Sequence, residues 1–123
     1  MSEISNNNKP HFEVCFSPAL LSNYNIEDKI VVVIDVLRAT TSMCIAFEHG
    51  AELIVPVETI EESMNFRKQG YLVGAERKGK KVDGFDFGNS PYSFMGEDIK
   101  NAKIAITTTN GTRAIKASAS ANK

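Results

Sequence analysis

The sequence predicts an α/β fold, in which helices cover a layered and at least partly parallel sheet. Apolar runs of strand length alternate along the 123-residue chain with segments of helical periodicity, and this alternation is typical of parallel sheets. Glycine stands where two predicted helices should end, at Gly50 and Gly70. Thr59 and Glu62 have the spacing of a capping box and indicate where the second of these helices begins.

The first fifty residues predict two strands and one helix. Residues 11–18 alternate apolar and polar side chains and end at a proline, which suits a short strand. Residues 30–36 are a β-branched run without alternation, and such a run indicates a central strand covered on both faces. Met43 and Ala46 then recur at helical spacing and predict a helix over residues 40–49.

The middle of the chain adds a strand, a helix and another strand. Residues 51–57 predict a strand in which Pro56 marks either the strand's end or an edge of the sheet. A helix should follow from the capping box and stop at Gly70. Residues 71–76 predict a short strand that ends in an acidic residue.

The last third of the chain predicts a long loop, a strand and a final helix. Residues 77–97 are rich in glycine and turn-forming residues, and a loop of this length is more often functional than idle. Residues 102–109 predict a strand, and a helix should follow Asn110. We expect a disordered N-terminus at residues 1–10 and a single α/β domain over residues 11–123, truncated at its C-terminus within the last helix.

Composition narrows the classes of partner. The chain has 14 basic and 15 acidic residues, a formal charge of −1, which gives no reason to expect a nucleic acid or an anionic membrane as partner. No apolar run approaches the roughly 20 residues of a membrane span. The N-terminal residues are polar and lack the apolar core of a signal peptide, so the sequence predicts a cytoplasmic protein.

Residue types suited to binding or catalysis follow three of the predicted strands. Ligands of α/β proteins bind outside the carboxyl ends of the strands, so parallel strands would bring these residues to one edge of the sheet. The convergence of the groups, rather than any one of them, indicates a functional site. The groups are Asp35 with Arg38, Glu76 with Arg77, and Thr107 to Thr109 with Asn110.

Asp35 lies where its strand should leave the core, and a carboxylate there needs a cation or hydrogen-bond donors. A salt bridge to Arg38 would satisfy it, and so would a magnesium ion, because Mg²⁺ prefers oxygen ligands and usually takes one or two carboxylates. Thr40 and Thr41 open the next helix. Their hydroxyls could cap the helix or help to bind a phosphate at its N-terminus, and the spacing leaves both roles open.

The stretch at residues 107–114 repeats this arrangement. Asn110 and Gly111 permit a tight turn with positive φ, which can direct successive backbone N–H groups at one ligand. Thr112 and Arg113 then begin a helix. The alternative is a hairpin turn with a solvated arginine, although the following residues have helical rather than strand character.

Glycines surround Asp86 in the long loop and would allow the backbone to approach a ligand closely. The alternative is a surface turn held on the core by Phe85 and Phe87. Asn89 and Ser90 follow in the same loop and add polar groups that could face the same edge of the sheet.

Residues 31–42, 74–91 and 107–114 together resemble the 2-phosphosulfolactate phosphatase family. The resemblance covers roughly residues 12–117, in the order of the family's motifs. It implies a three-layer α/β/α fold with a mixed, largely parallel sheet, and assembly as a homodimer. It also implies magnesium-dependent hydrolysis of a small anionic phosphomonoester, (2R)-phosphosulfolactate, in coenzyme M biosynthesis. Family members are about twice as long as this chain.

The resemblance and the residues together suggest roles for each group. Enzymatic hydrolysis of phosphate monoesters depends on charge stabilisation, which arginine and a metal ion can supply. A covalent route through Asp35, a non-catalytic module that binds phosphorylated metabolites, and an inactive fragment are the alternatives. The expected metal ligands are Asp35, Glu76 and Asp86. The expected catalytic residues are Asp35, Arg38 and Arg113. The expected phosphate-binding residues are Thr40, Thr41, Arg77, Asn89, Ser90, Asn110, Gly111 and Thr112.

Overall fold

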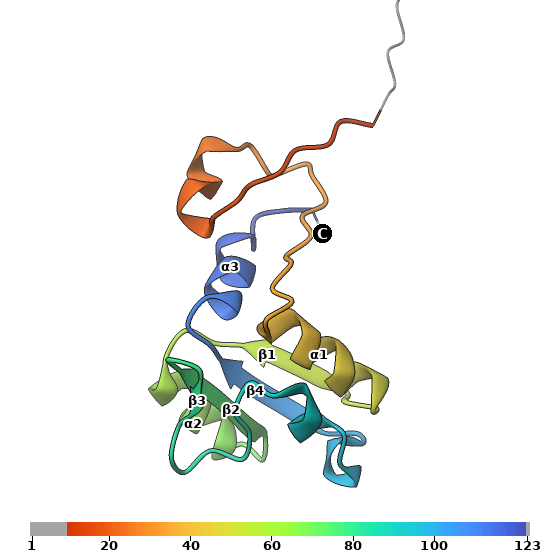
Figure 1. The fold of residues 1–123 in the computed structure, drawn as a ribbon, viewed down its shortest axis with the longest axis vertical. Coiled ribbons are helices and arrows are strands. Elements are labelled where there is room, and N and C mark those ends of the chain that lie inside the picture. Colours follow the sequence, from red (N-terminus) through yellow and green to blue (C-terminus); the bar gives the residue numbers. More distant parts are fainter. Residues whose placement is uncertain (1–9, 123) are drawn as a thin grey trace, which may run out of the picture.

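A computed structural model describes residues 10–122, so residues 1–9 of the predicted disordered N-terminus lie outside the described part. Its centre is a mixed sheet in the order β1-β4-β2-β3 (Figure 1). β4 pairs in parallel with β1 and with β2, and β3 pairs antiparallel to β2. The strands are β1 (Leu53–Pro56), β2 (Leu72–Arg77), β3 (Lys80–Lys81) and β4 (Lys103–Thr107).

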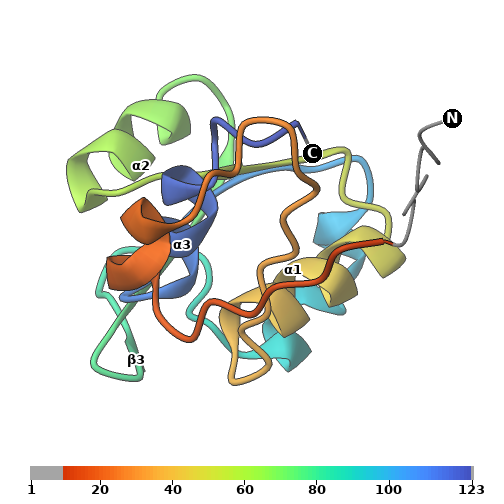
Figure 2. The same cartoon turned by 90° about the horizontal axis from the view of Figure 1, so that it is seen from above.

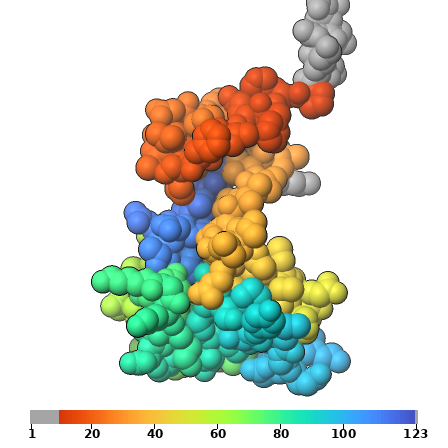
Figure 3. Space-filling model, in the orientation of Figure 1, coloured from red at the N-terminus to blue at the C-terminus, as the bar shows by residue number. Residues whose placement is uncertain are grey.

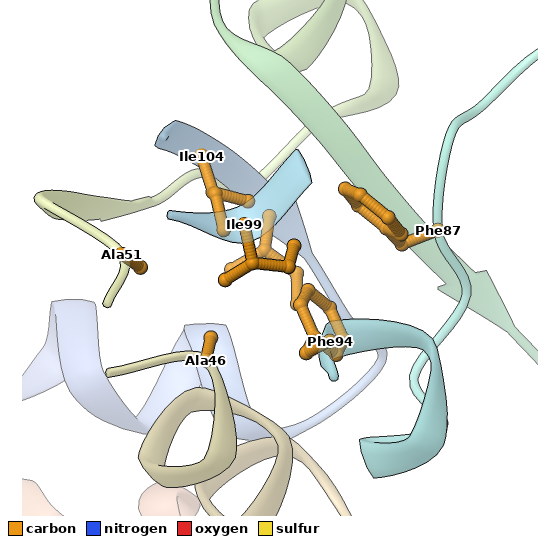
Figure 4. Packing of buried hydrophobic residues seen from close by; sticks show 7 residues of the cluster. Ala46, Ala51, Phe87, Phe94, Ile99 and Ile104 are labelled. Atoms are coloured by element: carbon orange, nitrogen blue, oxygen red, sulfur yellow. The ribbon is translucent and has the colours of Figure 1, made fainter. Parts of the chain in front are cut away.

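Helices cover both faces of the sheet, which confirms the predicted α/β fold and its three layers. On one face, Ala46 of α1 packs with Ile104 and Ile106 of β4 and with phenyl rings from the long loop (Figure 4). On the other face, Ile60 and Met64 of α2 pack against β2 and β4. The α-helices are α1 (Ala39–Glu48), α2 (Ile60–Arg67) and α3 (Gly111–Ala117), and the 3-10 helices are η1 (Pro18–Asn23), η2 (Pro91–Phe94) and η3 (Glu97–Ile99).

Local signals placed the elements between residues 39 and 117 correctly. The capping box is present, with the Glu62 N–H donating to Thr59 Oγ1 at 3.0 Å and the Thr59 N–H donating to Glu62 Oε2 at 3.3 Å. Gly50 and Gly70 follow α1 and α2 with positive φ values of 91° and 87°. β1 pairs only with β4 among the described residues, so Pro56 lies on an edge strand as the sequence predicts.

The long loop is held on the core by its aromatic side chains. Phe85, Phe87 and Phe94 are buried, and Phe87 and Phe94 stack with their ring centroids 5.0 Å apart. The surface-turn alternative is therefore correct for the packing of this loop. Within it, the two residues of β3 pair with the end of β2, and Phe87 forms an isolated parallel bridge with Gly74 of β2.

The two strands predicted at residues 11–18 and 30–36 are wrong. Neither segment joins a sheet in the described part of the chain, and residues 18–23 form η1 instead. Together with their connection they make an extension, residues 10–37, which we call the arm. Figure 1 shows most of the arm beyond α3, away from the sheet, with its last residues running down to α1, and Figure 2 shows the same arm from above. No helix within residues 10–122 is long and apolar enough to cross a membrane.

Candidate active site

The carboxyl ends of β1, β2 and β4 lie at one edge of the sheet because these three strands are parallel. The turn at residues 107–111, which joins β4 to α3, occupies this edge. Asp35 reaches it from the arm, and Glu76 reaches it from β2. The structure thus brings together residues that are far apart in the sequence.

Gly111 is the point of closest approach between the first and third motifs. A Cβ atom on Gly111 would overlap the Cβ of Ala39 and lie 2.9 Å from Asp35 Oδ2. The Asp35 carboxylate therefore lies at the first residue of α3. The predicted positive-φ turn is wrong: Asn110 has a φ of −124°, and Gly111 is the first residue of α3, outside the left-handed region. Glycine is needed there for space.

The hydroxyls of Thr40 and Thr41 fix the chain around Asp35. The Asp35 N–H donates to Thr40 Oγ1 at 2.8 Å, and the Thr40 N–H donates to the Asp35 carbonyl at 3.1 Å. Thr41 Oγ1 donates to the Val36 carbonyl at 2.8 Å. Neither hydroxyl caps α1, whose N-cap is Arg38. Both threonines hold the turn that positions Asp35.

Arg38 points to the end of β2 rather than to Asp35. Its Nη2 donates to the Gly79 carbonyl at 3.4 Å, in the turn between β2 and β3. No ion pair joins Arg38 to Asp35 in residues 10–122, so the salt-bridge explanation of Asp35 does not hold. Arg38 instead links the first motif to the end of β2.

Glu76 ties two turns of the site together. Its carboxylate accepts hydrogen bonds from the Gly79 N–H at 2.5 Å and from the Thr109 N–H and Oγ1 at 3.3 Å. Burial alone would raise the pKa of Glu76, but these donors and the positive charge of Arg77 bring the pKa below its ordinary value. The Glu76 side chain is therefore a charged brace, and its predicted role as a metal ligand stays a prediction.

Asp86 is not brought to this edge. Its Oδ1 pairs with Arg67 Nη2 at 2.8 Å, and its Oδ2 accepts the Val73 N–H at 2.8 Å. Burial tends to raise the pKa of Asp86, but the Val73 N–H and the Arg67 guanidinium lower it overall. Val73 precedes Glu76 by three residues, roughly 10 Å along the strand. The predicted set of three carboxylates is therefore not assembled.

Asn89 and Ser90 pass beside α1. The Asn89 carbonyl accepts a hydrogen bond from Ser42 Oγ at 3.0 Å, and the side chain is buried. Asn89 Oδ1 is buried without a hydrogen-bond partner in the described part of the chain, so this oxygen is available to a donor or a cation. Ser90 is the N-cap residue of η2, and its carbonyl accepts the Ser93 N–H.

A pocket of about 630 Å³ opens on the α2 side of the same edge. Arg77 is held there by hydrogen bonds from Nη2 to Thr107 Oγ1 at 3.0 Å and from Nη1 to the Glu76 carbonyl at 2.7 Å. Arg113 extends into the pocket from α3. The lining residues are Glu58, Thr59, Arg77, Thr108, Thr109, Arg113, Lys116 and Ala117.

Sequence reasoning missed Glu58, Thr59 and Lys116. Glu58 and Thr59 follow β1, so the rule about carboxyl ends of parallel strands could have found them, but Thr59 was interpreted only as a cap. Lys116 lies one helical turn after Arg113, and its Nζ is 3.8 Å from Glu58 Oε1. The pocket thus carries three cations, with one glutamate at its rim.

Thr112 is too deeply buried to bind a phosphate in this arrangement. Its hydroxyl accepts the Thr108 N–H and donates to the Thr108 carbonyl, both at 3.1 Å. The Thr112 N–H in turn donates to Thr108 Oγ1 at 3.1 Å. Thr112 therefore fixes the turn from inside, while Asn110 is exposed at its outer side.

The carboxylates of Asp35 and Glu76 and the cationic pocket lie on different faces of the sheet edge. Successive residues of a strand point to opposite faces, so Glu76 faces α1 and Arg77 faces α2. Asp35, Arg38 and Glu76 lie on the α1 side of the turn at residues 107–111. The cationic pocket lies on its α2 side.

A magnesium ion would have one free carboxylate at this edge. No group of three or more His, Cys, Asp or Glu side chains suited to a metal is found within residues 10–122. Asp35 makes no side-chain hydrogen bond or ion pair with the described residues, whereas Glu76 and Asp86 are both engaged. One carboxylate, with water and substrate oxygens, is within the usual protein share for Mg²⁺, so Asp35 alone fits such an ion.

A mixed α/β sheet with a cationic pocket at the carboxyl ends of its strands defines an α/β protein with a candidate anion-binding site. The comparisons with known proteins make the class specific. Residues 15–123 match the family model described as 2-phosphosulpholactate phosphatase, and the chain belongs to this family.

Three relatives illustrate the similarity, each named probable 2-phosphosulfolactate phosphatase. The relative from Carboxydothermus hydrogenoformans is 48% identical over 111 residues, 89% of this chain and 45% of the relative. The one from Thermotoga petrophila is 47% identical over 91 residues, 74% of this chain and 40% of the relative. The one from Caldanaerobacter subterraneus subsp. tengcongensis is 42% identical over 107 residues, 84% of this chain and 44% of the relative. The chain thus spans less than half the length of these relatives.

Proposed function

We propose that this chain contributes the phosphate-binding part of a phosphatase that hydrolyses a small anionic phosphomonoester. The observation that carries the proposal is the pocket at the strand ends, which is lined by the three cationic side chains Arg77, Arg113 and Lys116. Arginine binds phosphate oxygens in pairs, and charge stabilisation is the main requirement of phosphoryl transfer.

The substrate we propose is 2-phosphosulfolactate, which gives sulfolactate and phosphate, as in coenzyme M biosynthesis. The relatives carry this substrate in their names. The molecule has three anionic groups, and a pocket with three cations suits it better than it suits a neutral phosphorylated alcohol. The predicted homodimer and cytoplasmic location stay predictions.

We further propose Mg²⁺ as the cofactor, held by Asp35. When bound at Asp35, across the turn at residues 107–111 from the pocket, the ion would add positive charge beside the phosphate site and could lower the pKa of a water molecule. Asp35 is fixed for this role by the backbone hydrogen bonds of its turn with Thr40. Glu76 holds the turn at residues 107–111 between the carboxylate and the pocket.

Binding and hydrolysis can be tested separately. Titration of this chain with 2-phosphosulfolactate should give measurable affinity, and Arg113→Ala should weaken it by about 10-fold or more, because a charge-assisted contact is lost. Lys68→Ala removes an exposed charge outside the pocket and is the matched control. Equal affinity of Arg113→Ala and the unchanged chain would contradict the phosphate-binding role of the pocket.

Because this chain matches only 45% of the Carboxydothermus hydrogenoformans relative, hydrolysis is measured on a fusion of this chain to the unmatched region of that relative. Asp35→Asn should lower phosphate release by about 100-fold while leaving affinity for 2-phosphosulfolactate nearly unchanged. Chelation of divalent ions should have a similar effect. Full activity in chelator would disprove the magnesium proposal, and binding without any release would favour the non-catalytic metabolite-binding module.

A further inference from the structure

The arm contains a strand-like segment with no partner. The backbone N–H and C=O groups of residues 30–34 make no hydrogen bond within residues 10–122; the first such bonds occur at Asp35 and, on the other side, at Lys29. Figure 1 shows this segment running past α3 to α1 without meeting the sheet. An extended segment with unpaired backbone groups is a template for another strand.

One side of the segment is apolar and exposed, whereas Val31 and Val33 on its other side are half-buried. Ile30, Val32 and Ile34 are 73–76% exposed, and Val36, in the turn that follows, is 62% exposed. Phe12 and Phe16, from the first part of the arm, are also largely exposed. Figure 3 shows the first part of the arm standing off from the body of the molecule, while its last part runs down along the body to α1.

Such a surface differs from the scattered apolar residues found on most proteins. An apolar, β-branched run without alternation belongs to a strand with neighbours on both edges and layers on both faces. Within residues 10–122, no strand pairs with either edge of residues 30–34, and only one side of the segment, at Val31 and Val33, is partly covered. Large contiguous apolar patches of this kind mark interaction surfaces.

We propose that residues 30–36, together with residues 12–16, are the docking site for the region of the family's fold that this chain does not match. The matched parts make up 45%, 40% and 44% of three relatives, so each relative carries more than half of its length elsewhere. A region of that size can supply strands to both edges of the segment and cover for both faces. Residues 30–36 would then be a central strand of a second sheet.

A second copy of this chain suits the surface less well. Two copies related by a two-fold axis would pair residues 30–34 with themselves along one edge only. The other edge and its unpaired backbone groups would stay open. The unmatched region of the relatives has no such restriction, because its sequence differs from that of the arm.

The docking site adjoins the candidate active site but does not depend on the proposed function. Asp35 follows directly after the unpaired residues 30–34, and it reaches Gly111 at the start of α3. If residues 30–34 paired with another strand, the backbone directly before Asp35 would be held in place. Completion of the second sheet would therefore also restrict the position of the Asp35 carboxylate.

Hydrogen exchange on two molecules tests the proposal: this chain alone, and this chain fused to the unmatched region of the Carboxydothermus hydrogenoformans relative. In the chain alone, the amides of residues 30–34 should exchange at nearly the unprotected rate. In the fusion, they should exchange more slowly by on the order of 100-fold or more, because ladder hydrogen bonds form. The same unmatched region, made as a separate tagged polypeptide, should also retain this chain on an affinity column.

The double variant Val32→Lys/Ile34→Lys should abolish both the protection and the retention while leaving the melting temperature of this chain alone unchanged, since both side chains are exposed. Tyr92→Lys is the matched control, because Tyr92 is similarly exposed on η2, outside the arm. The proposal is overturned if the fusion gives no protection, or if the double variant keeps it. It is also overturned if this chain alone forms a dimer that protects residues 30–34.

Discussion

Residues 30–36 and β4 have similar sequences and opposite surroundings. Both are apolar runs of β-strand character that end beside hydroxyl or acidic residues. Ile104 and Ile106 of β4 are at most 1% exposed, whereas Ile34 of the arm is 76% exposed. Strand propensity is thus a property of the segment itself, but burial depends on neighbours that other parts of the chain must supply.

The neighbours of β4 come from both sides. β1 pairs with it from Leu53 to Pro56, and β2 pairs with it from Leu72 to Ala75, while α1 and α2 cover its faces. The arm has no strand partner within residues 10–122 and is tied to the rest of the molecule by the contact of η1 with α3, by the turn at Asp35, and by single bonds such as the Asn122 N–H to the Lys29 carbonyl at 3.1 Å. β4 therefore contributes to the stability of this chain, and the arm contributes little.

Matched truncations give the largest contrast between the two segments. Ile104→Ala should lower the free energy of unfolding by about 2–5 kcal/mol, because it removes buried contacts and leaves a cavity. Ile34→Ala should change it by less than about 0.5 kcal/mol, as for other exposed sites. Urea denaturation of this chain gives both values. If Ile104→Ala unfolds the chain, Ile104→Val replaces it in the comparison. The expected loss in free energy of unfolding is then about 0.5–1.5 kcal/mol.

If Ile104→Ala and Ile34→Ala lowered the free energy of unfolding equally, the arm would be packed in solution. The difference between the arm and β4 would then not hold. The same measurement on the fusion with the relative's unmatched region sharpens the test. There, Ile34→Ala should become as costly as Ile104→Ala, because the docking proposal places Ile34 in a second core.

A smaller loss of stability is expected at Gly111, where the start of α3 meets the start of α1 and the end of the arm. Gly111→Ala should destabilise the chain by about 1–3 kcal/mol, because the new methyl group overlaps Ala39 and crowds the Asp35 carboxylate. Gly96→Ala is the matched control: its methyl group would meet only the end of the exposed Asp98 side chain, which can move. Thermal unfolding of both variants measures the difference. Similar melting temperatures would show that the contact between α1 and α3 yields easily.

The fold could be predicted where a segment carries its own boundary signals. The capping box at Thr59, the terminating glycines and the edge proline Pro56 each depend on neighbours in the sequence, and each was placed correctly. The strands at 11–18 and 30–36 were wrong because pairing depends on residues distant in the sequence. Their apolar pattern indicates a covered strand, and no cover lies in the described part of the chain.

The site was predictable to the level of one sheet edge, because parallel strands bring their carboxyl ends together. The partners of individual side chains were not predictable. Asp86 lies in a suitable motif yet pairs with Arg67, and Thr112 is turned into the protein by Thr108. Each of these outcomes depends on contacts across more than one element. Glu76 was placed correctly at the edge, but as a brace between two turns.

Of the destabilising changes, loss of the Glu76 brace should have the smallest effect on stability, and its dependence on pH distinguishes it from the others. The pKa of Glu76 lies below its ordinary value of 4.5, so the ionised carboxylate stabilises the folded chain above pH 4.5 and loses this contribution as the pH falls through the folded-state pKa. Glu76→Gln should cost about 1–2 kcal/mol at pH 7, since an amide cannot accept all three donors. The difference between the two proteins should shrink below pH 4.5.

Glu97→Gln changes an exposed glutamate outside the turn and should leave unfolding at pH 7 unaltered. Urea denaturation of the three proteins at pH 7 and pH 3.5 compares them directly. Because Glu76 fastens Thr109, its loss should also loosen the turn at residues 107–111 and raise amide exchange there, while exchange in the unpaired arm stays the same. A cost for Glu76→Gln that is the same at both pH values would mean that the stabilisation does not come from the charged carboxylate, and the brace would then act through shape alone.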